Sequence, residues 1–229
     1  MKLGIMQPYF LPYIGYWQLL NAVDTYVIYD DVTFIKGGWI NRNNFLINKQ
    51  KKMFTIRLKK SSSYSLIKEI EILDGFDNFI KMLQANYAKA PYFRQIMGLV
   101  RQIIDFDKEN LALFITNAIK IIVEYLCINT NLVLSSELEK DKSLKGKDKV
   151  ISICKLLNAG DYYNSIGGIE LYDKNEFADN GIILHFLKTN ITPYKQFNND
   201  FIPGLSILDV MMFNSVQDIQ DMLSDYTLI

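Results

Sequence analysis

The sequence predicts an α/β fold built on a parallel sheet. A short apolar run at residues 3–6 is followed by a helical pattern at 14–23 and a second apolar run at 26–29. Strand, helix and strand in this order form a βαβ unit, whose right-handed crossover makes the two strands parallel. From 77 to about 127 the apolar residues recur at helical spacing. These observations favour a nucleotide-binding-like core of the Rossmann or HUP-like kind, with a mainly helical insertion.

The composition is that of a globular chain with a large core. Its 229 residues are 49% hydrophobic and include 14 Tyr and 14 Phe, so a core can form without disulfides or metals. We expect one α/β domain over residues 1–229, with a helical subdomain at about 77–127.

Charge and residue types exclude several classes of function. The 25 basic and 25 acidic residues cancel, so we expect no nucleic-acid partner. The longest apolar stretches are broken by charge well short of the roughly 20 residues that a membrane span needs, so we expect no membrane insertion. The chain has 1 His and 2 Cys, too few for a zinc cluster, and Cys127 and Cys154 lie in apolar patterns where a thiol packs as a small hydrophobe. The first residues lack the apolar run of a signal peptide, which predicts a cytoplasmic location. The aromatic content of 13% is compatible with a homo-oligomer.

After the βαβ unit, apolar and polar residues alternate at 54–58 and again at 67–73, on either side of a Ser-rich turn at 61–63. This alternation predicts two half-solvated strands. Helical spacing then predicts three helices, separated near Pro91 and at 105–107.

The second half again mixes strands and helices. The charged segment 137–149 carries both signs and is expected to be a solvated loop. The other expected elements are a strand at 132–134, a helix at 149–157, a strand ending at Ser165, a strand at 182–187 and helices at 205–213 and 216–223.

Polar residues follow both strands of the βαβ unit. Gln7 follows the first strand, and Asp30 and Asp31 follow the second. Ligands of open α/β sheets bind beyond the carboxyl ends of the strands. The sequence therefore places the candidate site at this edge of the sheet.

The loop after Gln7 contains Tyr13, Gly15 and Tyr16, close to a helix N-terminus. Gly15 would let a ligand approach the backbone, and the free N–H groups of the helix suit an anion. A tight turn packed by aromatic rings explains the same residues. The Tyr13-x-Gly15-Tyr16 spacing resembles the H-x-G-H signature of nucleotidyl-transfer folds, with tyrosines in place of the histidines.

A second cluster follows the second strand. Adjacent carboxylates at Asp30 and Asp31 can hold Mg²⁺, or one can act as a base, and they can equally cap a turn. Lys36 and Arg42 suit phosphate or carboxylate, and the Trp39 ring suits a sugar or a base, or simple packing. The polar or special residues of this short segment are Asp30, Asp31, Lys36, Trp39, Asn41, Arg42 and Asn43.

Later in the chain, Ser165, Gly167, Gly168 and Tyr172 follow a strand end and can close the site from the other side of the sheet; a glycine turn explains them as well. His185 stands in an apolar run, where a histidine is either half-buried and hydrogen-bonded or a proton-transfer group.

The chain resembles the WbqC-like family over nearly its whole length. The N-terminal matches are Gln7-Pro8, Pro12, Gly15-Tyr16, Asp24, Asp30-Asp31-Val32, Lys36, Trp39 and Asn41-Arg42-Asn43. Further matches are 153–155, 163–168, Leu171-Tyr172, Phe177, Gly181-Ile182, Tyr194, Gln196 and 201–209. The sequence departs from the family at Ile169-Glu170 and Met211-Met212.

This resemblance implies a role in bacterial O-antigen or other surface-polysaccharide synthesis, and a glycine transferase activity has been suggested for the family. Combined with the polar cluster, it leads to the hypothesis of an aminoacyl (glycyl) or acyl transferase that forms an amide on a nucleotide-linked amino sugar. The donor would be an amino acid or an acyl group, and ATP and Mg²⁺ are candidate cofactors. A nucleotidyltransferase acting on a sugar phosphate and a non-catalytic sugar-nucleotide-binding partner are the alternatives.

Overall fold

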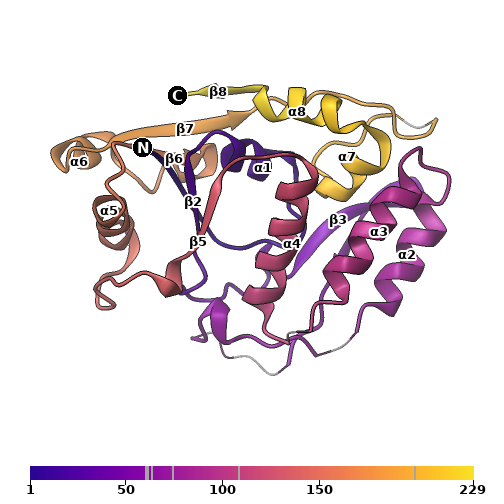
Figure 1. Ribbon diagram of the computed structural model, residues 1–229, viewed down its shortest axis with the longest axis horizontal. Helices are drawn as coiled ribbons and strands as arrows, with labels where there is room; N and C mark the ends of the chain where they lie inside the picture. The colour runs from indigo at the N-terminus through magenta and orange to yellow at the C-terminus, as the bar shows by residue number, and fades with distance from the viewer. Residues whose placement is uncertain (60–61, 63, 74, 108, 199) are drawn as a thin grey trace.

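The computed structural model describes residues 1–59, 62, 64–73, 75–107, 109–198 and 200–229. The main strands of these residues are β1 (Lys2–Met6), β2 (Thr25–Ile28), β5 (Asn131–Leu134), β6 (Asp161–Ser165), β7 (Ile183–Thr189) and β8 (Tyr226–Leu228). They form a six-stranded sheet in the order β5-β2-β1-β6-β7-β8 (Figure 1). The pairings from β5 to β7 are parallel, and β8 pairs antiparallel with β7. The prediction of an α/β fold with a Rossmann-like parallel core is confirmed.

The predicted βαβ unit is present as β1, α1 (Ile14–Asn21) and β2, with Leu3 opposite Thr25 and Met6 opposite Ile28. From β1 the chain adds β2 and β5 on one side, and then β6 and β7 on the other. The direction in which strands are added therefore reverses between β1 and β6. Open α/β sheets bind ligands outside the carboxyl ends of the strands at such a switch point.

A two-stranded hairpin follows, formed by β3 (Arg42–Ile47) and β4 (Gln50–Thr55). Its turn residues Asn48 and Lys49 have positive φ values of 51° and 61°, as a tight hairpin turn requires. The predicted strand at 54–58 is wrong in its bounds, because the exposed polar residues at the start of β4 hide the strand pattern.

The predicted strand at 67–73 is also wrong. The segment forms a short 3-10 helix, η1 (Ile67–Glu69), and then only isolated bridges, Leu58 with Ile72 and Glu71 with Asn110. Buried Ile67, Ile70 and Ile72 produce the apolar pattern by packing into the core, without a partner strand. The expected turn at 61–63 falls on residues 61 and 63, which lie outside the described residues.

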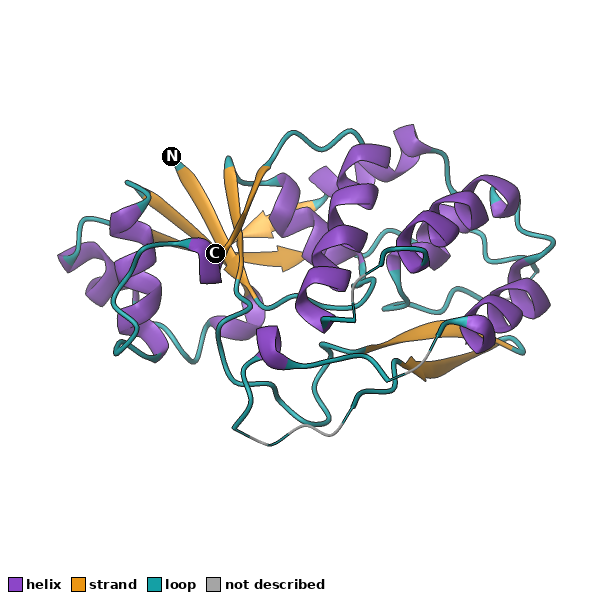
Figure 2. Ribbon diagram, turned by 60° about the horizontal axis from the view of Figure 1, so that its bottom comes forward, coloured by secondary structure: helices purple, strands orange, loops and turns teal. Residues whose placement is uncertain are grey.

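The three predicted helices are confirmed as α2 (Asp77–Tyr87), α3 (Phe93–Ile104) and α4 (Leu111–Tyr125). They lie to one side of the large sheet, next to the β3–β4 hairpin (Figures 1 and 2). Their buried residues belong to the same hydrophobic cluster as those of α1 and β3. The division into one domain with a helical subdomain stays a prediction.

The remaining elements are η2 (Ser135–Glu137), α5 (Gly146–Leu156), η3 (Ile166–Gly168), α6 (Lys174–Asp179), α7 (Ile207–Phe213) and α8 (Val216–Ser224). Side chains that alternate along the strands form two clusters on the two faces of the sheet. Leu3 and Ile5 of β1 pack with α5 and α6, whereas Met6 packs with the cluster that contains α1.

In the part of the chain that the structure describes, every helix is too short or too polar to cross a bilayer. Cys154 is buried, as expected, but Cys127 is exposed. That second expectation fails because Cys127 follows the end of α4 with a φ of 53°, outside the apolar face of the helix.

Candidate functional site

The structure brings several of the predicted residues to the carboxyl edge of the sheet. Gln7 follows β1, Asp30 and Asp31 follow β2, and Ser165 ends β6. The 3-10 helix η2 follows β5 at the same edge and adds Ser135, Ser136 and Glu137.

Asp30 links the ends of β2 and β5. Its side chain is 2% exposed, and its two carboxylate oxygens accept hydrogen bonds from the backbone N–H of Ser136 at 2.9 Å and its hydroxyl at 2.6 Å. The backbone carbonyl of Asp30 accepts a bond from Lys68 N. Since both oxygens are engaged, these contacts favour a structural role over the general-base or magnesium role.

Asp31 lies at the centre of an ion-pair network. Its Oδ2 is 2.9 Å from Lys140 Nζ and 3.1 Å from Lys149 Nζ, and its Oδ1 accepts a bond from the Ser135 hydroxyl at 2.7 Å. Lys149 also donates to the backbone carbonyl of Asp31, and Lys140 to that of Ser135. The side chains of Lys140, Lys149 and Asp31 are 3%, 10% and 12% exposed.

Burial alone would raise the pKa of Asp31. The hydrogen bonds from Ser135, Lys140 and Lys149 outweigh burial, and the net result is a pKa below the ordinary value of 3.8. Asp31 is therefore a carboxylate at neutral pH and a weak base, which suits it to holding the two lysines in place.

A pocket of about 440 Å³ opens beside this network. We call it the lysine pocket, and its lining includes Tyr29, Asp31, Thr33, Lys68, Ser136, Lys140, Lys142, Lys145 and Lys149. The side-chain charges in its lining are five lysines against one aspartate. Such a site attracts a multiply charged anion.

Sequence reasoning missed this pocket. The segment 137–149 was expected to be a solvated loop, but Lys140 and Lys149 turn inward to Asp31. One local signal was present: Lys149 lies four residues before Ile153, on the buried face of α5. A lysine on that face needs an anionic partner.

The contacts of Asp31 predict how the free energy of unfolding depends on pH. Because the pKa of Asp31 is lower in the folded chain than the unfolded value of 3.8, its charge stabilises the fold above that pH. This contribution is lost as the pH falls through the folded pKa. We expect Asp31→Asn to lower the free energy of unfolding by about 2 kcal/mol at pH 7, and by progressively less below pH 3.8.

Urea denaturation across this pH range measures the effect. Glu139→Gln is the matched control, because Glu139 is exposed and its substitution removes the same single negative charge as Asp31→Asn. A constant difference between Asp31→Asn and the parent down to pH 2.5 would contradict the assignment.

A second pocket, of about 240 Å³, lies between the loop after β1 and the β3–β4 hairpin. We call it the aromatic pocket; it is lined by Tyr9, Pro12, Tyr13, Trp39, Asn43, Asn44, Lys51 and Gly204. Trp39 is 47% exposed and Tyr13 is 37% exposed. The Arg42 guanidinium lies 5.9 Å from the centroid of the Trp39 ring.

Asn41 and Asn43 shape the surroundings of this pocket through their own hydrogen bonds. Asn43 Nδ2 donates to the carbonyl of Leu11 at 2.6 Å and to that of Phe10 at 3.2 Å. Asn41 Nδ2 donates to the carbonyl of Ile56 at 2.8 Å. Both side chains are at most 9% exposed, so their amides fix the loop and the hairpin.

Gly15 and Tyr16 lie in close contact with neighbouring side chains, which favours the packing role. A Cβ at Gly15 would lie 2.3 Å from Thr189 Oγ1 and 2.5 Å from the Tyr13 hydroxyl, so a larger residue would displace these side chains. Tyr16 is 3% exposed, and its hydroxyl donates to the carbonyl of Gln7. Burial raises the pKa of Tyr16 above its ordinary value, so the hydroxyl stays protonated. Lys36 is exposed on the loop before Trp39.

The residues after β6 line neither pocket. Gly168 is buried, and a Cβ there would lie 2.6 Å from Asn164 Nδ2. Tyr172 packs edge-on against Tyr162 and Phe177. Ser165 and Gly167 stand at the same strand end, at the carboxyl edge.

His185 lies away from that edge. Its Nε2 is 2.8 Å from Asp161 Oδ1, and its ring is 4.7 Å from that of Tyr163. Asp161 begins β6, so this pair lies toward the amino ends of the strands. These contacts favour the hydrogen-bonded structural role.

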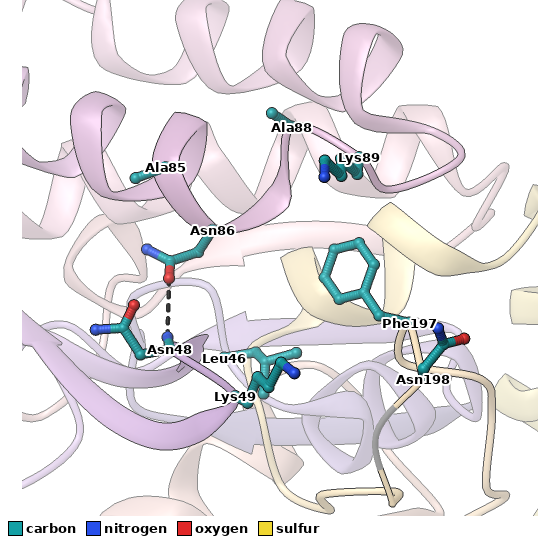
Figure 3. A pocket seen from close by; sticks show the side chains of 9 residues that line it. All are labelled: Leu46, Asn48, Lys49, Ala85, Asn86, Ala88, Lys89, Phe197 and Asn198. Carbon is teal, nitrogen blue, oxygen red and sulfur yellow. Dashed lines mark hydrogen bonds between the residues drawn. The ribbon is translucent and has the colours of Figure 1, made fainter.

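Another pocket, of about 480 Å³, lies beside the hairpin turn and the end of α2 (Figure 3). Its lining is Leu46, Asn48, Lys49, Ala85, Asn86, Ala88, Lys89, Phe197 and Asn198, and Asn86 Oδ1 accepts a bond from Asn48 N. None of the predicted site residues lines it.

The donor groups at the candidate site suit anions better than a protein-held metal. Within the described residues, no group of three or more His, Cys, Asp or Glu side chains could hold a metal ion. Mg²⁺ carried by a nucleotide needs few protein ligands, whereas the lysines can contact phosphate oxygens directly.

Comparison with known proteins gives a family but no activity. The sequence profile of the WbqC-like protein family matches residues 7–221. The uncharacterized protein Rv1507c of Mycobacterium tuberculosis (strain ATCC 25618 / H37Rv) is 28% identical over 229 residues, which cover 97% of each chain. No solved structure matches the chain. Since the profile spans both pockets and most of the sheet, the chain belongs to the WbqC-like protein family.

Proposed function

We propose that this protein is a cytoplasmic transferase that forms an amide between an aminoacyl (glycyl) or acyl group and a nucleotide-linked amino sugar during surface-polysaccharide (O-antigen) synthesis. The single observation that carries the proposal is the lysine pocket at the carboxyl ends of β2 and β5. It supports the binding of a diphosphate, the group that joins a nucleotide to its sugar.

The position and the charge of the pocket agree with this role. Rossmann-like sheets bind nucleotides beyond the carboxyl ends of their strands, at a switch point that in this sheet lies between β1 and β6. The lysine pocket lies at the same edge, at the ends of the neighbouring strands β2 and β5. The lysine ammonium groups supply charge and several N–H donors to phosphate oxygens. At about 440 Å³ the pocket falls in the range of roughly 300–1,000 Å³ that holds small ligands.

Asp31 and Asp30 have positioning roles in this account. Asp31 fixes Lys140 and Lys149 through its carboxylate, and Asp30 fixes the η2 segment through Ser136. Preorganised cations lose little conformational freedom when a ligand binds.

In the reaction, the nitrogen lone pair of the amino sugar attacks an activated carboxyl carbon. A C–N bond forms, the leaving group departs with its electron pair, and the amine loses a proton to solvent or to the leaving group. An acyl carrier or ATP would supply the activation, and in the second case the lysines would also suit the ATP phosphates.

The test is an assay with purified protein, a panel of nucleotide-linked amino sugars and either glycine with ATP and Mg²⁺ or activated glycyl and acyl donors. We expect a new amide, seen by mass spectrometry as the sugar nucleotide plus the acyl mass. Pyrophosphate release that depends on a sugar phosphate and not on an amino acid would instead establish the nucleotidyltransferase. Sugar-nucleotide binding without turnover of any donor would establish the non-catalytic partner.

A further inference from the structure

The aromatic pocket shares no lining residue with the lysine pocket, and it has the features of a ligand site of its own. Its lining is mostly apolar rings and backbone, and Lys51 is the one charged side chain among the residues that form it. Lys51 Nζ donates to the carbonyl of Pro203, so this charge also fixes the far wall beside Gly204.

Two of the rings present area to solvent. Trp39 and Tyr13 are 47% and 37% exposed, whereas the other tryptophan, Trp17, is completely buried. The Arg42 guanidinium near the Trp39 ring, at 5.9 Å from its centroid, helps to fix its orientation. Arg42 Nε is itself buried, without a hydrogen-bond partner in the part of the chain that the structure describes.

Asn44 supplies the polar group of the pocket. The residue is only 9% exposed and lines the pocket, and its backbone N–H and carbonyl are bonded to Asn43 Oδ1 and Ser206 N. Its side-chain amide, in contrast, has no hydrogen bond to any described residue. The amide nitrogen and oxygen are not fully buried. They are therefore accessible, and the amide offers one donor pair and one acceptor to a ligand in the pocket.

We propose that the aromatic pocket binds one pyranose ring. The C–H groups on one face of such a ring pack against an aromatic face, and its hydroxyls or acylamino group pair with a side-chain amide. At about 240 Å³ the pocket is smaller than the roughly 300 Å³ at which sites for drug-sized ligands begin, which fits a single ring better than an entire nucleotide sugar.

This inference rests on the proposed function and assigns the sugar of that reaction to the aromatic pocket. The chain from Thr33, in the lysine pocket, to Trp39, in the aromatic pocket, has six peptide steps. Their Cα atoms are therefore at most about 22 Å apart. This short segment therefore contributes lining residues to both pockets.

The indole N–H signals of the two tryptophans provide the test. In ¹⁵N-labelled protein, Trp39→Phe assigns the exposed indole. Trp17 is completely buried and does not line the pocket, but its Nε1 donates to the carbonyl of Pro12 in the lining, so it reports only indirect effects of binding. The probes are the methyl glycosides of glucosamine, galactosamine and N-acetylglucosamine, each raised to about 50 mM because a single ring binds weakly. We expect a saturable shift of the Trp39 signal that is larger than any shift of the Trp17 signal.

Asn44→Ala should weaken this binding about fivefold or more, because one hydrogen bond is lost. Asn175→Ala, at an exposed position of α6 outside the pocket, is the matched control. Uridine is the competing probe. If uridine shifts the Trp39 signal and the glycosides do not, the pocket binds a nucleobase and the proposal is overturned. If neither probe shifts the signal, the proposal is also overturned. Inorganic pyrophosphate, titrated into the same sample, separates the two ideas: if it binds and the glycosides fail, only the sugar assignment fails.

Discussion

Lys149→Ala is expected to weaken the binding of inorganic pyrophosphate by about 10- to 150-fold. The estimate follows from the roughly 1.5–3 kcal/mol that a hydrogen bond to a charged group contributes. Lys149 Nζ is only 3.1 Å from Asp31 Oδ2 and lines the pocket, so its removal deletes a fixed cation and one of the contacts that order Asp31. Isothermal titration calorimetry of the parent and the variant measures the change.

The matched control is Lys155→Ala. Lys155 belongs to the same helix, α5, but its Nζ bonds to Asn180 Oδ1 at the surface and it does not line the pocket. If the parent and Lys149→Ala bind pyrophosphate equally well, Lys149 does not contact the phosphate. If Lys155→Ala loses as much affinity as Lys149→Ala, the effect comes from the overall charge of the protein.

Asp209→Ala is expected to cause the largest loss of stability. Asp209 is completely buried in α7, and its carboxylate accepts bonds from Tyr194 at 2.6 Å, Tyr87 at 2.7 Å and Gln196 at 2.8 Å. The variant leaves three buried donors without this acceptor. We expect the free energy of unfolding to fall by at least about 3 kcal/mol, and the melting temperature by about 6–12 °C.

The loss should depend on pH. Burial raises the pKa of Asp209 above 3.8, although the bonds from Tyr194, Tyr87 and Gln196 lower it in part. A raised folded pKa means that protonation favours the fold, and that this contribution declines as the pH rises through the folded pKa. The difference between the parent and Asp209→Ala should therefore grow as the pH is lowered from 7 to 4.

Thermal melts over this range measure both effects. Asp221→Ala, on the exposed side of α8, is the control for the loss of an aspartate. A shift in melting temperature no larger than that of Asp221→Ala would contradict the role assigned to the network.

The parts of the fold that the sequence predicted are those set by local pattern. The βαβ unit and the helices α2 to α4 follow from short-range apolar spacing, which the structure keeps. The β3–β4 hairpin was missed because the buried polar residues of β3 disguise it: Asn43 and Asn44 are at most 9% exposed, and Asn43 is bonded to a loop more than thirty residues away. Strand order depends on contacts between distant segments and could not be read from spacing.

The position of Asp30 and Asp31 at the carboxyl edge of the sheet follows from the sequence, whereas their contacts do not, and their part in a functional site stays a prediction. Asp31 was singled out because it ends a strand, and the structure puts it at the expected edge. Its partners Ser135 and Lys149 lie 104 and 118 positions further along the chain, so no local pattern could connect them. Two adjacent carboxylates suggest a base or a metal site only if their oxygens are free. In the folded chain, hydroxyl groups bond to both carboxylates, and two lysine ammonium groups pair with Asp31.

Trp39 shows the opposite case. A large aromatic residue in a loop could pack or bind, and its 47% exposure favours binding, together with the amide of Asn44, which lines the same pocket and is bonded to none of the residues that the structure describes.

A calorimetric titration of the unmodified protein with inorganic pyrophosphate tests whether the lysine pocket is a diphosphate site. We expect saturable binding of one pyrophosphate per chain, with an affinity that falls steeply as NaCl is raised, because lysine–phosphate contacts are screened by salt. No saturable heat at low ionic strength, or binding that is indifferent to salt, would contradict this expectation.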